Sequence, residues 1–407
     1  MKKLLMLGGS NCQKSGIIKA KAMGFDVIVA DISENPVGII PGVTHERVST
    51  FDFEGCRDAA EKHNILGVMT MGTDQPVLTA AKVQKALGLP GFLDESTALS
   101  VTDKVLMKER LERGGIPICP FYTVKENEDM KKRGFKGPVV IKPSDSQGQR
   151  GVFLLKDEDE VKDYLALSLG FSRTKEAMVE EYYPSSELTV SGFVKSGKLH
   201  ILTVTDRLHL QSGNHIGIAR AHKYPTRFKE NLDEIENICN KIKAAFNVKE
   251  GPLYIQLLLG EKGIVVNEVA ARLGGAFEDI FIPLVTGFDI LRNVIRGTVG
   301  EETDINPLKV FDFKETGYEA YVELMFSNPG IIEYMTDIKE VEKMKDVVFA
   351  GYNFKKGHEI TEIVDATQRA GFIVFVNGEG TLAKSLKDFQ KKFKILNKEG
   401  VNLYKPL

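Results

Sequence analysis

A lysine followed by a polar, glycine-containing loop is the feature of this sequence most suggestive of chemistry. Lys142 comes at the end of an apolar run that begins at Val139, and the loop Ser144 to Gly151 follows it. Glycine lets backbone N–H groups approach anionic oxygens closely, and an ammonium group offsets their charge. The combination predicts a polyphosphate site, although the loop taken alone is also compatible with an ordinary hairpin tip.

Two other segments could complete a nucleotide site. Lys104 follows Asp103 at the expected start of a helix and could share the phosphates with Lys142, the alternative being an ordinary surface lysine. The strand Met178 to Tyr183, with Glu187 after it, could offer its backbone to adenine. Its carboxylates could accept hydrogen bonds from the adenine amino group and the ribose hydroxyls, or they could simply be solvated.

A predicted hairpin carries Gln256, Glu268 and Arg272. A three-residue turn, Glu261-Lys262-Gly263 with the glycine left-handed, sets a register in which Gln256 faces Glu268. Two oxygen ligands on one sheet face suit magnesium bound to phosphates, because this cation prefers hard oxygen ligands. Arg272 could stabilise charge on a transferring phosphoryl group or a tetrahedral intermediate. The alternative is a buried Glu268–Arg272 pair that only supports the sheet.

The secondary structure predicted around these residues changes along the chain, from alternating strands and helices to antiparallel strands. Over the first ninety residues, short apolar runs at 3–7, 26–30 and 67–71 alternate with helical patterns, which predicts a doubly wound parallel sheet. A helical segment from 96 to 113 ends at a glycine- and proline-rich stop, and antiparallel strands follow. The loop Ser144 to Gly151 has no apolar anchor, so we expect few contacts to hold it and predict a mobile lid.

The turn after the first strand keeps a second class of function open. It lacks both the glycine that a Walker A loop needs before Lys14 and the G-x-G-x-x-G of a dinucleotide site. Asp31 nevertheless ends the second strand, where a ribose-binding carboxylate would lie. An NAD-dependent oxidoreductase is therefore an alternative, as is a turn that merely packs a helix on a strand, and a non-catalytic nucleotide sensor comes third.

Composition and charge exclude several classes of function. The 407 residues include 54 Lys and Arg against 56 Asp and Glu, so we expect no nucleic-acid partner, which would require a one-sided basic surface. No apolar run approaches the roughly 20 residues that cross a bilayer, and the run after Met1 is too short for a signal peptide. We therefore expect a cytoplasmic protein with no membrane partner.

The four cysteines, at positions 12, 56, 119 and 239, lie far apart. Their spacing argues against both a zinc site and a disulfide framework. Cys12, in the glycine-rich first turn, could be a nucleophile, although a small packing residue is its more usual role.

Together and in this order, the motifs resemble those of the ATP-grasp carboxylate–amine ligases over nearly the whole chain. They are Gly72-Thr73-Asp74-Gln75, Leu87-Gly88-Leu89-Pro90-Gly91, Asp103-Lys104, Val140-Ile141-Lys142-Pro143, the loop to Gly151, Val179-Glu180-Glu181-Tyr182 and Asn267-Glu268-Val269-Ala270-Ala271-Arg272. The strand Gly251 to Gln256 is similar to one in the carbamoyl phosphate synthetase large subunit, where glutamine is a metal ligand. Biotin carboxylase and amino-acid ligases are similar in layout.

This resemblance implies an ATP-grasp fold that combines α/β and α+β architecture. A Rossmann-like, doubly wound pre-ATP-grasp domain is expected at 1–95. The ATP-grasp domain is expected at 96–300, with a mobile lid subdomain at about 117–182. A C-terminal α+β domain at 301–407 is expected to complete the site.

The resemblance also implies residue roles. Lys104 and Lys142 would bind the ATP phosphates, with Lys142 also catalytic, under a loop that contains Ser146, Gly148 and Gly151. Glu180 and Glu181, with the backbone near Tyr183, would bind adenine, and Glu187 would hold ribose. Gln256 and Glu268 would hold Mg²⁺, for which Mn²⁺ can substitute, and Arg272 would act at the reacting phosphate. Ala270 stands where many members have an asparagine ligand, so one metal ion is better supported than two.

The implied reaction is attack of a substrate carboxylate on the γ-phosphate of ATP, followed by displacement of phosphate by an amine. Positioned lysines, magnesium and arginine suffice for such phosphoryl transfer, so no Ser-His-Asp set is needed. Both substrates are expected to be small molecules, and a homodimer is left open. The expected substrate residues are His209, His215 and Arg220, together with Gly274 and Gly275; surface histidines are the alternative for the first two.

Within this family, an amino-acid or peptide ligase fits better than phosphoribosylglycinamide synthetase or another purine-pathway ligase. The size and domain order of that synthetase match this chain. However, its usual Ala-Ala-Gly-Lys-Gly loop is replaced here by Ser-Gln-Gly-Gln-Arg-Gly, and its Phe-Gly-Asp-Pro-Glu run by Leu273 to Phe277.

Overall fold

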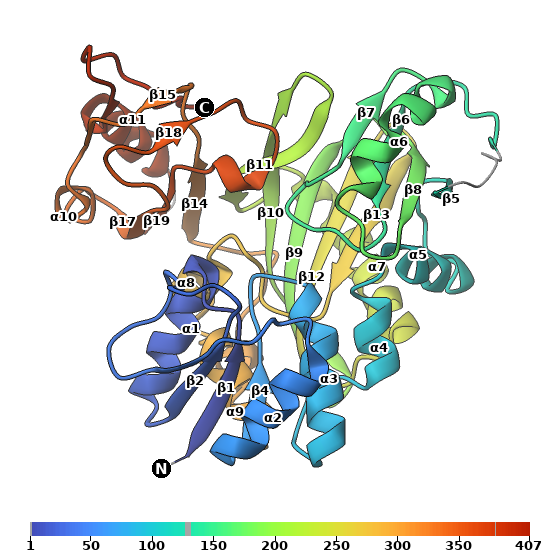
Figure 1. Ribbon diagram of the computed structural model, residues 1–407, viewed down its shortest axis with the longest axis vertical. Helices are drawn as coiled ribbons and strands as arrows, with labels where there is room; N and C mark the ends of the chain where they lie inside the picture. The colour runs from blue at the N-terminus through green and yellow to red at the C-terminus, as the bar shows by residue number, and fades with distance from the viewer. Residues whose placement is uncertain (1, 127–131, 379) are drawn as a thin grey trace.

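The computed structural model describes residues 2–126, 132–378 and 380–407 (Figure 1). A small parallel sheet near the N-terminus lies at the bottom of Figure 1, and a much larger antiparallel sheet extends above it. None of the helices in the described ranges is long and apolar enough to span a bilayer.

The N-terminal unit is a parallel sheet with the strand order β3-β2-β1-β4. Its elements are β1 (Lys3–Leu7), α1 (Asn11–Ala22), β2 (Asp26–Ala30), β3 (Thr44–Glu46), α2 (Phe53–His63), β4 (Gly67–Met69) and α3 (Gln75–Leu87). Four successive residues of β1, Leu4 to Leu7, have no exposed surface, as expected for a parallel strand covered on both faces. The predicted doubly wound sheet is confirmed.

The predicted helix over 96–113 is two helices, α4 (Glu95–Ser100) and α5 (Lys104–Arg113). The break arises because Asp103 adopts an extended conformation and acts as a second N-cap, its side chain accepting a hydrogen bond from the Leu106 N–H at 2.9 Å. This break brings Lys104 to the first position of α5.

The large sheet has twelve strands in the described residues, nine of which follow the order β13-β12-β9-β10-β11-β7-β6-β8-β5. These nine are β5 (Phe121–Lys125), β6 (Val139–Pro143), β7 (Phe153–Leu155), β8 (Glu176–Glu181), β9 (Ser186–Lys195), β10 (Lys198–Ser212), β11 (His215–Tyr224), β12 (Gly251–Gly260) and β13 (Gly263–Ala270). Their connections include η1 (Glu158–Glu160), α6 (Val161–Leu169), η2 (Lys229–Asn231) and α7 (Leu232–Ala245), and α8 (Glu278–Thr286), α9 (Ile290–Thr298) and η3 (Asn306–Lys309) follow β13. The predicted hairpin around the loop Ser144 to Gly151 is confirmed, with Ile141 paired to Phe153.

The C-terminal part continues this large sheet. Strand β14 (Tyr318–Met325) pairs with both β11 and β19 (Gly371–Gly378), and β17 (Val347–Tyr352) pairs with β19. The remaining elements are β15 (Gly330–Ile331), β16 (Tyr334–Met335), α10 (Ile338–Val341), β18 (Glu359–Ile360), η4 (Ala366–Gln368), α11 (Leu382–Lys392) and β20 (Ile395–Leu396). Because β14 is hydrogen-bonded to β11, this part, at the upper left of Figure 1, adjoins the middle of the large sheet.

The hairpin β12–β13 confirms the predicted pairing of Gln256 with Glu268, but through a different geometry. The turn has two residues between paired Gly260 and Gly263, one fewer than predicted. A β-bulge then restores the expected register, because Asn267 is an extra residue between Val266, opposite Leu257, and Glu268, opposite Gln256.

Candidate active site

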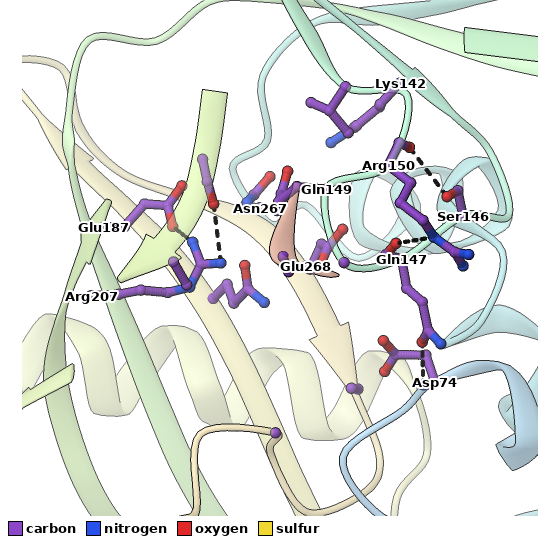
Figure 2. Close-up of a pocket in the computed structure, with 18 of the residues that line it drawn as sticks. Asp74, Lys142, Ser146, Gln147, Gln149, Arg150, Glu187, Arg207, Asn267 and Glu268 are labelled. Atoms are coloured by element: carbon purple, nitrogen blue, oxygen red, sulfur yellow. Dashed lines mark hydrogen bonds and ion pairs between the residues drawn. The ribbon is translucent and has the colours of Figure 1, made fainter. Parts of the chain in front are cut away.

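A cavity of about 750 Å³ lies where the N-terminal unit, the large sheet and the C-terminal part meet. Figure 2 shows the loop residues Ser146, Gln147 and Arg150 on one side and Glu187 with Arg207 on the other, with Asn267 and Glu268 between them. The C-terminal part contributes Asn353 and Arg369 among others. Side chains from distant parts of the sequence therefore share one cavity.

Most of the predicted site residues line this cavity. They are Lys104, Lys142, Ser146, Gly148, Glu180, Glu181, Tyr183, Glu187, His209, Gln256, Glu268, Arg272 and Gly275.

Four predicted residues are not among the lining residues, and each is engaged elsewhere. Arg220 donates to the carbonyl oxygen of Lys405, and His215 packs on the ring of Phe153 with centroids 5.0 Å apart. A Cβ on Gly151 would meet Phe171 at 2.8 Å, and one on Gly274 would meet the Glu278 carboxylate at 2.4 Å. The structure thus corrects the placement of all four, since none of them is among the residues that line the cavity.

A buried ionic chain holds Lys142 in place. Its ammonium lies 2.5 Å from one Glu180 oxygen, and the other oxygen lies 2.9 Å from the ammonium of Lys108. Burial alone would raise the pKa of Glu180, but the two lysines hold it at about 2. The carboxylate is therefore ionised and paired with both lysines, and it positions Lys142; its predicted contact with adenine stays a prediction.

Glu187 is engaged in the same way. Its carboxylate pairs with Arg207, and one oxygen lies 2.7 Å from His209 Nε2. Burial would raise its pKa, but Arg207 and His209 lower it to about 2. A ribose role for Glu187 would require it to share its carboxylate with these two groups.

The predicted metal residues have free oxygens that face the cavity. Glu268 lies 3.8 Å from the ammonium of Lys104, and despite burial the pKa of its carboxyl is lowered by Lys104 and Lys142. Gln256 Oε1 is buried and has no hydrogen-bond partner. The bulge residue Asn267 also lines the cavity next to Glu268 (Figure 2).

This donor set fits Mg²⁺. Among the described residues no cluster of three or more His, Cys, Asp or Glu side chains is arranged for a metal, and the oxygen donors that lie together here are the Glu268 carboxylate and the amides of Gln256 and Asn267. Mg²⁺ suits such a set, because it usually binds one or two carboxylates and takes its other ligands from substrate phosphates and water.

The loop Ser144 to Gly151 is fastened at several points, so the prediction that few contacts hold it is wrong. Lys104 donates to Ser144 O through its backbone, at 3.0 Å, and to Ser146 O through its ammonium. The Gln147 side chain accepts from the Asp74 N–H at 2.7 Å, and Gly148 O accepts from Ala366 N at 3.1 Å. The loop therefore contacts both terminal parts of the chain; that it moves as a lid remains a prediction.

Arg272 pairs with a carboxylate other than the one considered from sequence. Its guanidinium donates to Asp74 Oδ1, with the Nη2 atom at 2.6 Å, and stacks over the Tyr254 ring at 5.0 Å. The described residues contain no Glu268–Arg272 ion pair, which removes the purely structural alternative for Glu268. Arg272 is thus fixed at the cavity wall by the N-terminal unit.

The first glycine turn is occupied by internal contacts. Asp31, the proposed ribose carboxylate of the oxidoreductase alternative, accepts from the Gly9 and Ser33 N–H groups at 2.8 Å each. Gln13 and Ser10 close a capping box at the start of α1. These contacts support the simpler interpretation, in which the turn packs a helix on a strand.

The sequence of this chain is similar to that of known proteins. Residues 135–279 match the ATP-grasp domain. An L-arginine-specific L-amino acid ligase from Bacillus subtilis is 25% identical over 319 residues, 74% of this chain and 71% of that protein. The chain therefore carries an ATP-grasp domain over residues 135–279.

Solved structures with this fold cover almost the whole chain. The L-amino acid ligase from Bacillus licheniformis has a TM-score of 0.81 at 19% identity, covering 98% of this chain and 99% of its own. Phosphoribosylglycinamide synthetase from Anaerococcus prevotii has a TM-score of 0.75 at 17% identity, covering 98% and 100%. At these identities, the likeness establishes the ATP-grasp fold.

Several residues of this ATP-grasp site were missed by sequence reasoning. Lys108 lies one helical turn after Lys104, a spacing that places both on one face of α5 and was a usable signal. Asn267 is adjacent to a predicted ligand, but only the bulge reveals that it lines the cavity. Asp74 and Arg369 come from distant parts of the chain, and their roles depend on tertiary contacts.

We predict that Glu180→Gln destabilises the protein by about 3–5 kcal/mol at pH 7, because it leaves two buried lysines without their shared carboxylate. The pKa of Glu180 in the folded state, about 2, lies below its usual 4.5. Its contribution is therefore present above about pH 4.5 and is lost as the pH falls toward 2. Urea denaturation at pH 7 and pH 3 measures this, and the difference from wild type should shrink at pH 3.

The matched control is Glu95→Gln, which breaks the exposed Lys85–Glu95 pair and should cost less than about 1 kcal/mol. A Glu180→Gln loss as small as that of the control would contradict the buried ionic chain.

Proposed function

We propose that this ATP-grasp ligase activates a carboxylate as an acyl phosphate and couples it to the amine of an amino acid, releasing ADP and phosphate. The observation that carries the proposal is the cluster of Glu268, Gln256 and Asn267 facing the cavity beside Lys104 and Lys142. Hard oxygen ligands and two ammonium groups in one cavity suit a magnesium-bound triphosphate.

The residues act by positioning and by charge. Lys104 and Lys142 neutralise phosphate oxygens, and Lys142 is held ready by Glu180. Glu268, Gln256 and Asn267 would hold Mg²⁺, which would offset the charge of the phosphate groups. Arg272, fixed by Asp74, stabilises negative charge that develops during transfer.

The reaction balances without a further co-reactant. A carboxylate oxygen attacks the γ-phosphorus, the bond to the bridging oxygen breaks, and ADP leaves. The amine nitrogen then attacks the acyl carbon, its C–O bond to phosphate breaks, and phosphate departs while the nitrogen loses a proton. General electrostatic stabilisation and positioning suffice for such a sequence.

Two lines of similarity favour amino-acid substrates. The Bacillus subtilis relative is named an L-amino acid ligase, and a dapdiamide A synthase from Enterobacter agglomerans is 20% identical over 323 residues. The second candidate is a reaction like that of phosphoribosylglycinamide synthetase, favoured by its whole-chain structural likeness. The two differ in whether the amine is carried by an amino acid or a sugar phosphate.

We expect ADP and phosphate to accumulate when the full chain is incubated with ATP, Mg²⁺ and a pool of amino acids, and not when the pool is withheld. Mass spectrometry should find a product equal to two substrates less one water. Testing the amino acids of the pool singly and in pairs then identifies the two substrates. Stimulation only by glycine with phosphoribosylamine would favour the second candidate, and ADP release that ignores every amine and carboxylate would contradict both.

We predict that Glu268→Gln lowers magnesium-dependent turnover about 100-fold or more, the size typical of losing one preorganised charge at a reacting phosphate. The melting temperature should fall only slightly, because glutamine has the same size and the ion pair that is lost, with Lys104, is long at 3.8 Å. Glu261→Gln, at the exposed tip of the same hairpin, is the control and should change neither quantity. A large loss of melting temperature with near-normal turnover would disprove the metal role of Glu268.

A further inference from the structure

The arginines that line the cavity do not all have a carboxylate partner. Arg207 is paired with Glu187, and Arg272 is paired with Asp74. Arg369 also lines the cavity, but within the described ranges no carboxylate lies at ion-pair distance from it. Arg369 is half-buried, and a cation that is partly removed from water without a counter-charge lacks a stabilising ionic partner, so the site has room for a negative group at this position.

Only some of the hydrogen-bond donors of the Arg369 guanidinium have a partner. Its Nη2 donates to Ala219 O on β11 at 3.1 Å, whereas its Nε is buried with no hydrogen-bond partner. Burial, with Arg207 nearby, lowers the pKa of Arg369 to about 10, so the side chain stays charged at neutral pH. Donors therefore remain for an anion inside the cavity.

The segment that carries Arg369 is tied to both other parts of the chain. Its backbone oxygen accepts from Asn353 Nδ2 at 3.0 Å, and Asn353 Oδ1 accepts from Asn11 of α1 at 2.8 Å. Ala366, at the start of η4, donates to Gly148 of the phosphate loop. Arg369 is thus held at the junction of the three parts of the chain.

We propose that Arg369 binds the carboxylate of the amine-bearing substrate, which makes that substrate an amino acid or a short peptide with a free carboxylate. This inference rests on the proposed function. A guanidinium matches a carboxylate through two parallel hydrogen bonds. A carboxylate held in this way is a poor nucleophile, so Arg369 recognises the carboxylate that is not activated.

The surroundings favour a carboxylate over a phosphate and a small substrate over a large one. Two polar neighbours of Arg369 are already engaged: Asn353 uses its amide on Arg369 O and on Asn11, and Arg207 is paired with Glu187, so both have little left to offer a phosphate. Ala219, whose carbonyl oxygen accepts from Arg369, has a small side chain, and Gly275 and Ala276 also line the cavity. A Cβ on Gly275 would lie 2.9 Å from Gly72 O, which leaves no room for a larger residue there.

A binding measurement tests the site without relying on turnover. The melting temperature of the full chain is followed with MgADP and increasing concentrations of free amino acids, their C-terminal amides, or glycerol phosphate. Wild type should be stabilised by at least one free amino acid and not by its amide, and Arg369→Gln should lose that shift. Stabilisation by glycerol phosphate alone would overturn the carboxylate assignment.

A kinetic measurement tests the same residue with the activated acid and MgATP held constant. Arg369→Gln and Arg369→Lys should raise KM for the amine donor about 10- to 100-fold, the loss expected for one charge-assisted pair, and leave KM for ATP unchanged. They should also abolish the preference for the free acid over its amide. Lys355→Gln, an exposed cation of the C-terminal part, is the control and should behave as wild type.

The outcomes separate this inference from the proposed function. Unchanged KM and unchanged acid preference in Arg369→Gln would overturn the role of Arg369 while the ligase function stands. An amino-acid stabilisation that Arg369→Gln removes, in a protein that forms no product with any amine and carboxylate, would leave the subsite in place and overturn the proposed function.

Discussion

The carboxylate of Glu180, shared by two buried lysines, is the interaction on which the rest of the site depends. It fixes Lys142 at the end of β6, and through Lys108 it ties α5 to β8 and β13, because Lys108 also donates to Val266 O at 3.0 Å. Buried charges are tolerated only when paired, and removing one partner is far more costly than breaking a surface pair. The positive wall is therefore assembled before any substrate arrives.

Other charged side chains around the cavity are also paired, and this pairing holds them in place. Glu187 compensates Arg207, and Asp74 compensates Arg272 across the boundary between the N-terminal unit and the large sheet. Each pair restrains a side chain at the wall, which reduces the reorganisation needed when a charged ligand binds. Arg369 has no such carboxylate partner among the described residues, which is the basis for proposing a substrate carboxylate as its partner.

The bulge at Asn267 shows how a regular hairpin becomes a ligand site. Without the extra residue, the two-residue turn would place Asn267 opposite Gln256. The bulge shifts the pairing by one, so that Glu268 faces Gln256 while Asn267 stays beside it at the cavity. Three oxygen-bearing side chains then face one space.

Local patterns in the sequence predicted much of this arrangement. The apolar run ending at Lys142, the glycine loop after it and the hairpin carrying Glu268 are short-range signals, and the structure contains all three. The predicted helix over 96–113 ran through Asp103, although Asp103-Lys104 was also expected to open a helix; in the structure the aspartate is the N-cap of a separate helix. Phosphate-binding roles and the limits of the three predicted domains remain predictions.

What the sequence could not predict depends on distant contacts. The loop seemed free because its partners, Asp74 and Ala366, lie far along the chain in both directions. Arg220 seemed available to a substrate, but its guanidinium donates to a carbonyl 185 residues away. A strand pattern shows that a side chain alternates between faces, not what packs on each face.

We propose above all that this cavity binds a magnesium nucleoside triphosphate beside Lys142, and that the first glycine turn does not bind a dinucleotide. Isothermal titration calorimetry of the full chain in Mg²⁺ tests it most directly. We expect saturable binding of ATP and ADP and no heat with NAD⁺. Saturable binding of NAD⁺ together with no binding of ATP or ADP would contradict it.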